Sequence, residues 1–259
     1  MSDNFKLKGK NILITGASKG LGSVCAKALS RQNTKLVLMA RSKENLESVR
    51  NACKNSNQHL CIPVDLSDIK QLQNGVSCAR KFLKNIDVIL HVAGGGLGLR
   101  ENLINAEDFL KLFKLNIISA SEINRLILPE MIKRGSGNIV HIGSIASMEA
   151  TGSVGYNTVK AALASYVRSL GSKIAGTGVI VTGILPGGFL APGNSWEQLK
   201  TNKPEVVDKF IKERLPRGFL GNSEELIPMI LLLCSGAASM MAGCMVPIDA
   251  GEGKAYVNL

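Results

Sequence analysis

The sequence predicts an α/β fold, in which a doubly wound parallel sheet of about seven strands carries helices on both faces. Short apolar runs alternate with longer amphipathic stretches, which is typical of right-handed strand–helix–strand crossovers. Several runs are continuous in Ile, Val and Leu, as expected of strands buried on both faces. No linker, repeat or low-complexity segment interrupts residues 1–259, so we expect a single domain.

The expected strands and helices alternate along most of the chain. The expected strands are Asn11–Thr15, Lys35–Ala40, His59–Val64, Val88–Val92, Asn138–Ile142, Val179–Ile184 and Met245–Ile248. The expected helices are Gly20–Gln32, Glu44–Asn55, Ile69–Leu83, Ala106–Arg134, Tyr156–Ala175 and Ser223–Ser235.

A segment at about residues 186–220 breaks this alternation. It contains four prolines and two short helical stretches, around Trp196–Lys200 and Glu205–Arg214. The segment leaves the carboxyl end of a strand, where open α/β sheets bind ligands, so we expect it to be a substrate lid. Its apolar side chains either line a substrate pocket or pack the lid onto the body; they are Phe189, Leu190, Trp196 and Phe210.

The composition disfavours several classes of partner. The net charge is +11, but basic residues are mixed with acidic ones and only 4% of residues are aromatic. We therefore expect no nucleic-acid partner, and a basic surface that attracts a phosphorylated cofactor or an acidic substrate. No run reaches the ~18 apolar residues that span a bilayer, and no signal peptide is visible, so we expect a cytoplasmic protein without a membrane partner.

The cysteines and histidines show no spacing that chemistry requires. The six cysteines form no Cys-x-x-Cys pair, and the three histidines lack metal-ligand spacing. We expect neither a metal site nor disulfides, and reduced thiols in helices and strands instead.

A glycine-rich loop follows the first expected strand and opens the first expected helix. Its sequence is Thr15-Gly16-Ala17-Ser18-Lys19-Gly20-Leu21-Gly22. The missing side chains let backbone approach a pyrophosphate, and the helix N-terminus supplies N–H groups and positive potential. This pattern predicts a nucleotide cofactor.

The end of the second expected strand indicates which cofactor. Arg41 stands where an acidic residue would accept hydrogen bonds from the ribose of NAD, whereas arginine suits the extra phosphate of NADP. Lys19 supplies a second cation in the loop. The alternative is that both are solvated surface charges, but the position of Arg41 favours NADP(H).

Tyr156 and Lys160 lie four positions apart, and therefore on one face of a helix. A neighbouring ammonium favours phenolate, so we expect it to lower the pKa of the phenol. A tyrosine of this kind gives or takes a proton at a hydroxyl or carbonyl oxygen.

These motifs together resemble the short-chain dehydrogenase/reductase family, in its short single-domain branch with a Rossmann-type sheet. The resemblance runs from Lys8 to about Gly253. It rests on the glycine loop, Ser144 and Tyr156-x-x-x-Lys160, and on further matches at Asp65, Ala93-Gly94, Asn116 and Pro186-Gly187.

The resemblance implies a role for each matching residue. Tyr156 would be the general acid or base, and Ser144 would hydrogen-bond the substrate oxygen. Lys160 would hold the nicotinamide ribose and lower the Tyr156 pKa, and Asn116 would support a water that relays protons. The implied cofactor-binding residues are Gly16, Ser18, Lys19, Gly20, Leu21, Gly22, Arg41, Ser42, Asp65, Leu66, Ala93, Gly94, Tyr156, Lys160, Pro186 and Gly187.

Three of these residues also have plainer interpretations. Ser144 could cap a turn, Asn116 could bond within its own helix, and Asp65 could cap the helix that follows it.

The chain departs from the family pattern at several positions. His91-Val92 replaces two asparagines that brace the central sheet, and we expect a structural rather than catalytic His91. Ala191 stands where a threonine usually contacts the carboxamide, so that contact must come from elsewhere, for example from backbone near residues 189 and 190. Ser147 is an alternative to Ser144 only if the loop is rearranged. The glycine-rich stretch 94–98 makes Leu97 and Leu99 candidate pocket residues.

We therefore expect an NADP(H)-dependent oxidoreductase that interconverts a ketone and a secondary alcohol, and acts as a reductase in cells. The nearest functional resemblance is to 3-oxoacyl-carrier-protein reductases, with a carrier-protein or CoA thioester as substrate. One alternative is a dehydrogenase of a sugar, polyol or other polar small molecule, and another is a non-catalytic NADPH-sensing regulator. By analogy we expect a homotetramer or homodimer, with Tyr166 and Leu170 on an interface.

Overall fold

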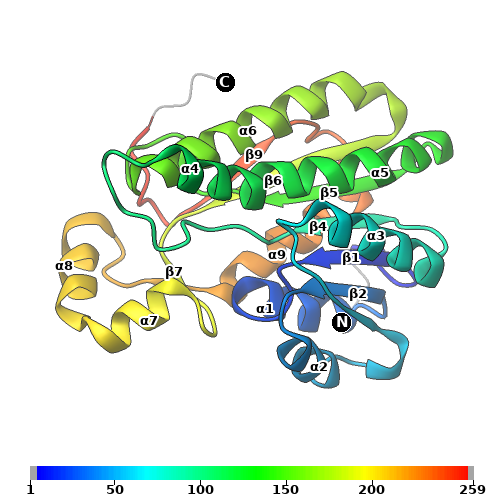
Figure 1. The fold of residues 1–259 in the computed structure, drawn as a ribbon, viewed down its shortest axis with the longest axis horizontal. Helices are drawn as coiled ribbons and strands as arrows, with labels where there is room; N and C mark the ends of the chain where they lie inside the picture. The colour runs from blue at the N-terminus through cyan, green and yellow to red at the C-terminus, as the bar shows by residue number, and fades with distance from the viewer. Residues whose placement is uncertain (1–4, 256–259) are drawn as a thin grey trace.

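The central feature of the structure, a computed structural model that describes residues 5–255, is a seven-stranded parallel sheet (Figure 1). The strand order is β3-β2-β1-β4-β5-β6-β9, and each neighbouring pair is parallel. The predicted fold class is thus confirmed. The strands are β1 (Asn11–Thr15), β2 (Lys35–Ala40), β3 (Leu60–Pro63), β4 (Val88–His91), β5 (Gly137–Ile142), β6 (Val179–Pro186) and β9 (Met245–Ile248).

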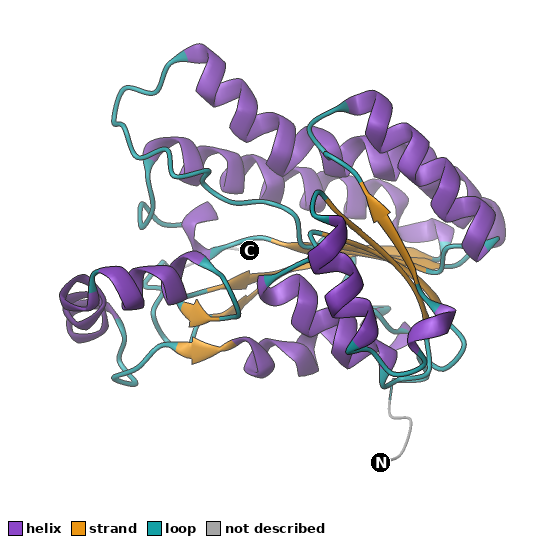
Figure 2. Ribbon diagram, turned by 60° about the horizontal axis from the view of Figure 1, so that its bottom comes forward, coloured by secondary structure: helices purple, strands orange, loops and turns teal. Residues whose placement is uncertain are grey.

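Helices cover both faces of this sheet (Figure 2). One face packs against α1 (Gly20–Ser30), α2 (Lys43–Asn51) and α9 (Ser223–Leu233). The other face packs against α3 (Ile69–Leu83), α5 (Ser119–Arg134) and α6 (Val154–Ile174). Short helical turns occur at η1 (Ser56–Gln58), η3 (Ile145–Ser147), η4 (Ala175–Thr177) and η5 (Gly236–Ala238).

Alternate strand residues supply the two halves of the core. In β1, Ile12 and Ile14 join the α1–α2–α9 side, whereas Leu13 joins the α3–α5–α6 side. Both halves are closed to water, with all three side chains fully buried. Burial of continuous apolar runs on both faces is the physical basis of the sequence signal that predicts the sheet.

The predicted helix Ala106–Arg134 contains a feature that its periodicity does not reveal. It comprises α4 (Ala106–Phe113), a π-helical turn η2 (Lys114–Ile118) and α5. Asn116 lies at the centre of the π turn. Single π turns inside helices are frequent at functional sites.

The other expected boundaries differ by a few residues. The largest difference is at α2, which ends at Asn51 rather than at residue 55. Asn55 adopts a left-handed conformation, with φ of 56°, which no helix continues through. Propensity alone locates such ends only approximately.

The segment that breaks the alternation forms a small folded unit at the carboxyl end of β6, drawn yellow to orange in Figure 1. It contains β7 (Phe189–Leu190), α7 (Ser195–Asn202), α8 (Pro204–Arg214) and β8 (Gly221–Asn222). Strands β7 and β8 pair in parallel, which the sequence does not predict.

The apolar side chains of this segment pack mainly within it. The rings of Trp196 and Phe210 lie 4.3 Å apart, and both join a small cluster around Val207 and Leu220. Leu190 packs on the same cluster, whereas Phe189 packs against the main core. These contacts favour the packing interpretation of Leu190, Trp196 and Phe210, whereas Phe189 also lines a small cavity.

Within residues 5–255, no helix combines the length and apolar character that crossing a membrane requires.

We predict that Gly171→Ala lowers the melting temperature, because α6 passes very close to the turn before β9. A Cβ at residue 171 would lie 2.4 Å from the backbone nitrogen of Gly243. Overpacking of this kind costs about 1–3 kcal/mol, or roughly 2–12 °C for a domain of this size. Gly176→Ala is the matched control, since a Cβ there has no neighbour within 4 Å. Equal melting temperatures for the two variants would contradict the prediction.

Candidate active site

The predicted site residues converge at the carboxyl ends of the parallel strands. Strands β1 and β4 lie side by side, so the loops that follow them meet. Strands β5 and β6 are also neighbours, and they lead to Ser144 and to Pro186-Gly187. The topology therefore gathers motifs that are spread over about 170 residues of sequence.

The glycine loop is held by contacts that leave no room for side chains. Gly16 has a φ of 68°, and a Cβ on it would lie 2.7 Å from the backbone nitrogen of Ala93. A Cβ on Gly22 would lie 2.1 Å from the carbonyl oxygen of Gly16. Helix α1 then begins at Gly20, and no side chain caps its N-terminus. The loop therefore presents backbone rather than side chains, as a cradle for a phosphate group requires.

The segment after β6 touches this cradle. The Gly20 N–H donates a hydrogen bond to the carbonyl oxygen of Pro192, at 2.7 Å. Ala191 is buried beside it, so the position where the family usually has threonine carries no polar side chain. Sequence reasoning missed the Pro192 contact, because nothing in the spacing predicts a backbone bond across 172 residues.

The residues expected near the adenosine end of a cofactor lie at the ends of β2 and β3. Arg41 is exposed directly after β2, and the Ser42 hydroxyl accepts a hydrogen bond from the Asn45 N–H at the start of α2. Asp65 accepts a hydrogen bond from the Ser67 N–H at 2.8 Å, but the residue that caps α3 is Asp68, so the helix-capping interpretation of Asp65 is wrong. Leu66 is buried in the core. Arg41 is therefore the member of this group whose charge faces solvent.

Lys160 is buried, and its partner is a backbone group. Its side chain donates from Nζ to the carbonyl oxygen of Ile142 at 3.1 Å. Burial lowers the pKa of Lys160 to about 8, because an ammonium loses its hydration there. Nζ lies 5.6 Å from the centroid of the Tyr156 ring on the same face of α6.

The pKa of Tyr156 differs from the sequence-based expectation. Burial of the phenol raises its pKa, and hydrogen bonding with Ser144 lowers it only in part. The expectation that the Lys160 ammonium lowers this pKa is wrong for the structure, because the effects that shift it are desolvation, which dominates, and the Ser144 hydrogen bond. The phenol is therefore protonated near neutral pH.

Ser144 both caps a turn and lies next to Tyr156. Its hydroxyl oxygen accepts a hydrogen bond from the Ala146 N–H at 3.1 Å, at the start of η3. The Ser147 hydroxyl donates to the Ser144 carbonyl oxygen at 2.8 Å. Ser147 thus braces the turn that places Ser144 at the site.

Asn116 joins the π turn to the glycine stretch after β4. Its Oδ1 accepts from the Gly95 N–H at 3.0 Å, and its Nδ2 donates to the carbonyl oxygens of Gly95 and Leu112. A Cβ on Gly94 would lie 2.8 Å from Asn116 Oδ1 and 3.3 Å from Lys160 Nζ. Asn116 therefore bonds within its helix and also holds the loop against Lys160.

The rest of the glycine stretch faces outward. Leu97 is 48% exposed with a φ of 53°, and the Leu99 carbonyl oxygen accepts a hydrogen bond from the Ser153 hydroxyl at 2.9 Å. Gly96 lies against the ring of Tyr156, where a Cβ would be 3.6 Å from its Cδ2. The exposed Leu97 side chain is thus available to a substrate at the edge of the site.

One buried carboxyl group near the site was not predicted. Glu252 is 3% exposed, and its Oε2 accepts a hydrogen bond from the Gly188 N–H at 2.6 Å. Burial raises the pKa of Glu252. No motif or spacing singles out this residue, because its partner is a backbone group from a different strand end.

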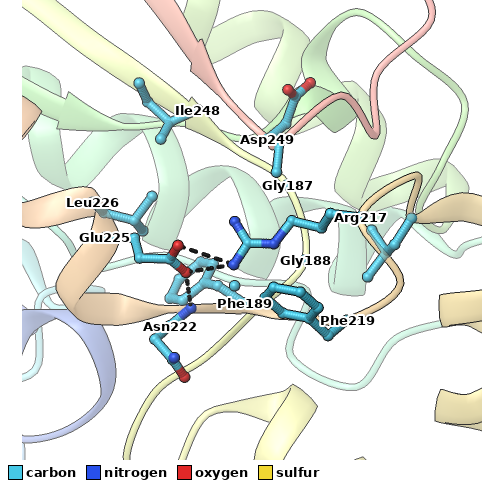
Figure 3. A pocket seen from close by; sticks show the side chains of 13 residues that line it. Gly187, Gly188, Phe189, Arg217, Phe219, Asn222, Glu225, Leu226, Ile248 and Asp249 are labelled. Atoms are coloured by element: carbon cyan, nitrogen blue, oxygen red, sulfur yellow. Dashed lines mark hydrogen bonds and ion pairs between the residues drawn. The ribbon is translucent and has the colours of Figure 1, made fainter.

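A small cavity lies beside Gly187 and Gly188 (Figure 3). Arg217 crosses it and donates from Nη2 to both carboxylate oxygens of Glu225, at 2.9 Å each. The Phe219 ring lies 4.2 Å from the guanidinium carbon. This ion pair ties the end of the α7–α8 segment to the start of α9.

Comparisons with known proteins agree with this arrangement. A family model described as short chain dehydrogenase matches residues 10–201. The ketoacyl reductase HetN of Nostoc sp. is 35% identical over 184 residues, which cover 70% of this chain and 64% of HetN. The 3-oxoacyl-(acyl-carrier-protein) reductase FabG of Aquifex aeolicus is 27% identical, with 95% of this chain and 98% of FabG covered.

A solved structure extends the likeness to three dimensions. L-Sorbose reductase from Gluconobacter frateurii, complexed with NADPH and L-sorbose, superposes with a TM-score of 0.88. The two sequences are 26% identical, over 96% of this chain and 98% of the reductase. The chain belongs to the short-chain dehydrogenase/reductase family, and it is an oxidoreductase of the type that uses a nicotinamide cofactor.

We predict that Lys160→Met stabilises the fold at neutral pH. The folded pKa of about 8 lies below the usual value of 10.5, so the charged lysine costs roughly 3 kcal/mol below pH 8. That cost is relieved as the pH rises from about 8 to 10.5, so the gain should shrink over this range. Melting curves at pH 7 and pH 10 measure it. Lys173→Met, at an exposed position in the last turn of α6, is the control. A Lys160→Met variant less stable than wild type at pH 7 would contradict the prediction.

Proposed function

We propose that the protein is an NADP(H)-dependent oxidoreductase that reduces a ketone to a secondary alcohol. The observation that carries this proposal is the convergence of Tyr156, Lys160, Asn116 and Ser144 next to a glycine cradle. The loop fits the phosphates of a dinucleotide, because Gly16 and Gly22 let it pack tightly against neighbouring backbone, where a Cβ would clash, while the position of Gly20 has open space around it.

The proposed roles follow from the geometry of the four side chains. A bound nicotinamide would supply the hydride to the carbonyl carbon. Tyr156, protonated near neutral pH, gives its proton to the carbonyl oxygen, and Ser144 holds that oxygen. Lys160 orients the cofactor ribose and replaces the proton, while Asn116 supports the water through which protons reach Lys160. A neutral phenol suits the reductive direction, because that direction needs an acid.

The preference for NADP(H) rests on Arg41 and Lys19. Arg41 is exposed at the end of β2, beside the glycine cradle, and a guanidinium pairs well with a phosphate. The L-sorbose reductase was solved with NADPH. Ser42, Asp65 and Leu66 complete the proposed adenosine end of the site.

The proposed substrate is a ketone held between the glycine stretch after β4 and a lid formed by residues 186–220. Two of the relatives are ketoacyl reductases, which supports a 3-oxoacyl thioester of a carrier protein or CoA. A second candidate is a sugar or polyol, which the buried Glu252 carboxyl and the likeness to L-sorbose reductase favour. An NADPH-sensing regulator is the alternative of another class. A cytoplasmic homotetramer or homodimer remains part of the proposal.

We predict that Tyr156→Phe lowers turnover roughly a hundredfold or more, because general acid catalysis contributes about that much. NADPH binding, followed by fluorescence, should stay close to the wild-type value. Turnover near the wild-type rate would exclude Tyr156 as the acid, and would favour the regulator.

We predict that Arg41→Asp reverses the cofactor preference. Loss of a charged hydrogen bond to the phosphate should lower kcat/KM for NADPH by about tenfold to a hundredfold, while NADH is affected less. Lys43→Asp changes the charge equally, two residues away at the start of α2, and serves as the control. A wild-type enzyme that prefers NADH would contradict the Arg41 argument.

The test of substrate class is consumption of NADPH against a panel of β-ketoacyl thioesters, diketones and keto-sugars. Thioester turnover alone would support the first candidate, and keto-sugar turnover alone would support the second.

A further inference from the structure

Two buried histidines lie side by side in the middle of the sheet, on the face covered by α5 and α6. His91 of β4 is in register with His141 of β5, and their rings stack with centroids 4.5 Å apart. His91 is 4% exposed and His141 is fully buried. Side chains from the two covering helices complete the group, namely Asn124 of α5 and Tyr166 of α6.

The hydrogen bonds define how the protons are arranged. Asn124 Oδ1 faces His91 Nε2 at 2.9 Å, so His91 must donate from that nitrogen. Asn124 Nδ2 donates to the Tyr166 hydroxyl at 3.1 Å and to His141 Nε2 at 3.5 Å. His141 therefore accepts at Nε2 and carries its proton on Nδ1, a buried atom that has no hydrogen-bond partner among the described residues. Both imidazoles are neutral in this arrangement.

His141 connects this group to Lys160. The next residue of β5 is Ile142, whose carbonyl oxygen accepts the hydrogen bond from Lys160 Nζ. Burial, the neighbouring His91 and the Lys160 ammonium all lower the pKa of His141, and burial has the largest effect. Coupling of this kind is reciprocal, so a charge on His141 would in turn disfavour the charge on Lys160.

The surroundings of His141 contain few groups that titrate. The titratable side chains are His91 from β4, and Lys160 and Tyr166 from α6. Helix α5 contributes the uncharged Asn124, and β6 contributes Gly183, which pairs with His141 and has no side chain. A buried imidazole pair without a facing carboxylate stays neutral.

We propose that the buried His91, Asn124 and His141 and the half-buried Tyr166 form an uncharged group, the "imidazole support", which positions Lys160. The support fixes the end of β5, and with it the carbonyl oxygen to which Lys160 binds. It also keeps a water-free, neutral surface beneath the ammonium. The four residues act through Lys160 rather than on a substrate, so they are positioning residues. The link to catalysis rests on the role proposed for Lys160.

The first test reads the pH dependence of turnover. In His141→Asn the smaller polar side chain leaves room for water near the ammonium, so the pKa of Lys160 should rise. We expect the basic limb of the kcat profile to move up by about half a unit or more. His59→Asn is the matched control: His59, directly before β3, is also buried, but its partners are the Leu36 N–H of β2 and the Lys54 carbonyl oxygen, on the side of the sheet away from β5. An unchanged profile in His141→Asn, with only a lowered melting temperature, would overturn the proposal.

The second test needs no turnover. The chain has three histidines, so ¹⁵N-labelled ring resonances are readily assigned. We expect the Nε2–H form for His91, the Nδ1–H form for His141, and both rings neutral around pH 6.5, where an ordinary imidazole titrates. Lys160→Met should raise the pH at which His141 titrates. An ordinary titration of His141 near pH 6.5, or no change in Lys160→Met, would overturn the proposal.

The two tests separate this proposal from the proposed function. If Tyr156→Phe retains turnover, the proposed chemistry fails while the ring resonances still report on the support. If Tyr156→Phe is inactive and the ring resonances contradict the expected forms, the support alone fails.

Discussion

Much of the site depends on one physical constraint, the burial of the Lys160 ammonium against a backbone carbonyl. Burying an ammonium costs free energy because it loses its hydration. The partner of Lys160 is the neutral carbonyl oxygen of Ile142 and not a carboxylate that would neutralise the charge. The π turn at Asn116, the glycine at residue 94 and the end of β5 all converge on it. Folding thus carries a free-energy cost for holding the Lys160 charge at this buried position.

Burial separates the pKa values of Tyr156 and Lys160, because it raises the first and lowers the second to about 8. Each shift is opposite in direction to the one that an ion pair would produce, since an ion pair would lower the pKa of Tyr156 and raise that of Lys160. The phenol holds its proton more firmly, and the ammonium gives its proton up more easily. The reduction that we propose needs a protonated Tyr156, because the acid must hold its proton when the carbonyl arrives.

Site residues that belong to a local sequence pattern could be predicted from the sequence. Residues whose role depends on contacts between distant parts of the chain could not. The strand–loop–helix pattern at Gly16 and the spacing of Tyr156 and Lys160 are local, and the fold class follows from apolar runs. The π turn is invisible to periodicity, because an extra residue in one helical turn shifts the pattern only slightly. His91 was expected to be structural, yet its partners lie 33 and 50 residues away in the sequence and are brought near only by the topology. The pKa of Tyr156 was mispredicted because helix spacing carries no information on solvent access.

The short parallel pair β7–β8 bears on how chains with this fold can change. It pairs residue 189 with residue 221 and residue 190 with residue 222. The excursion formed by residues 191–220 therefore begins and ends at the same two-stranded sheet. The cost of closing a loop grows only slowly with its length, so helices within the excursion can be lengthened, shortened or exchanged while the sheet stays as it is. Its aromatic cluster is carried within it, so such a change would not open the main core. A chain built this way can exchange this segment while the side chains at the ends of the main strands stay where they are.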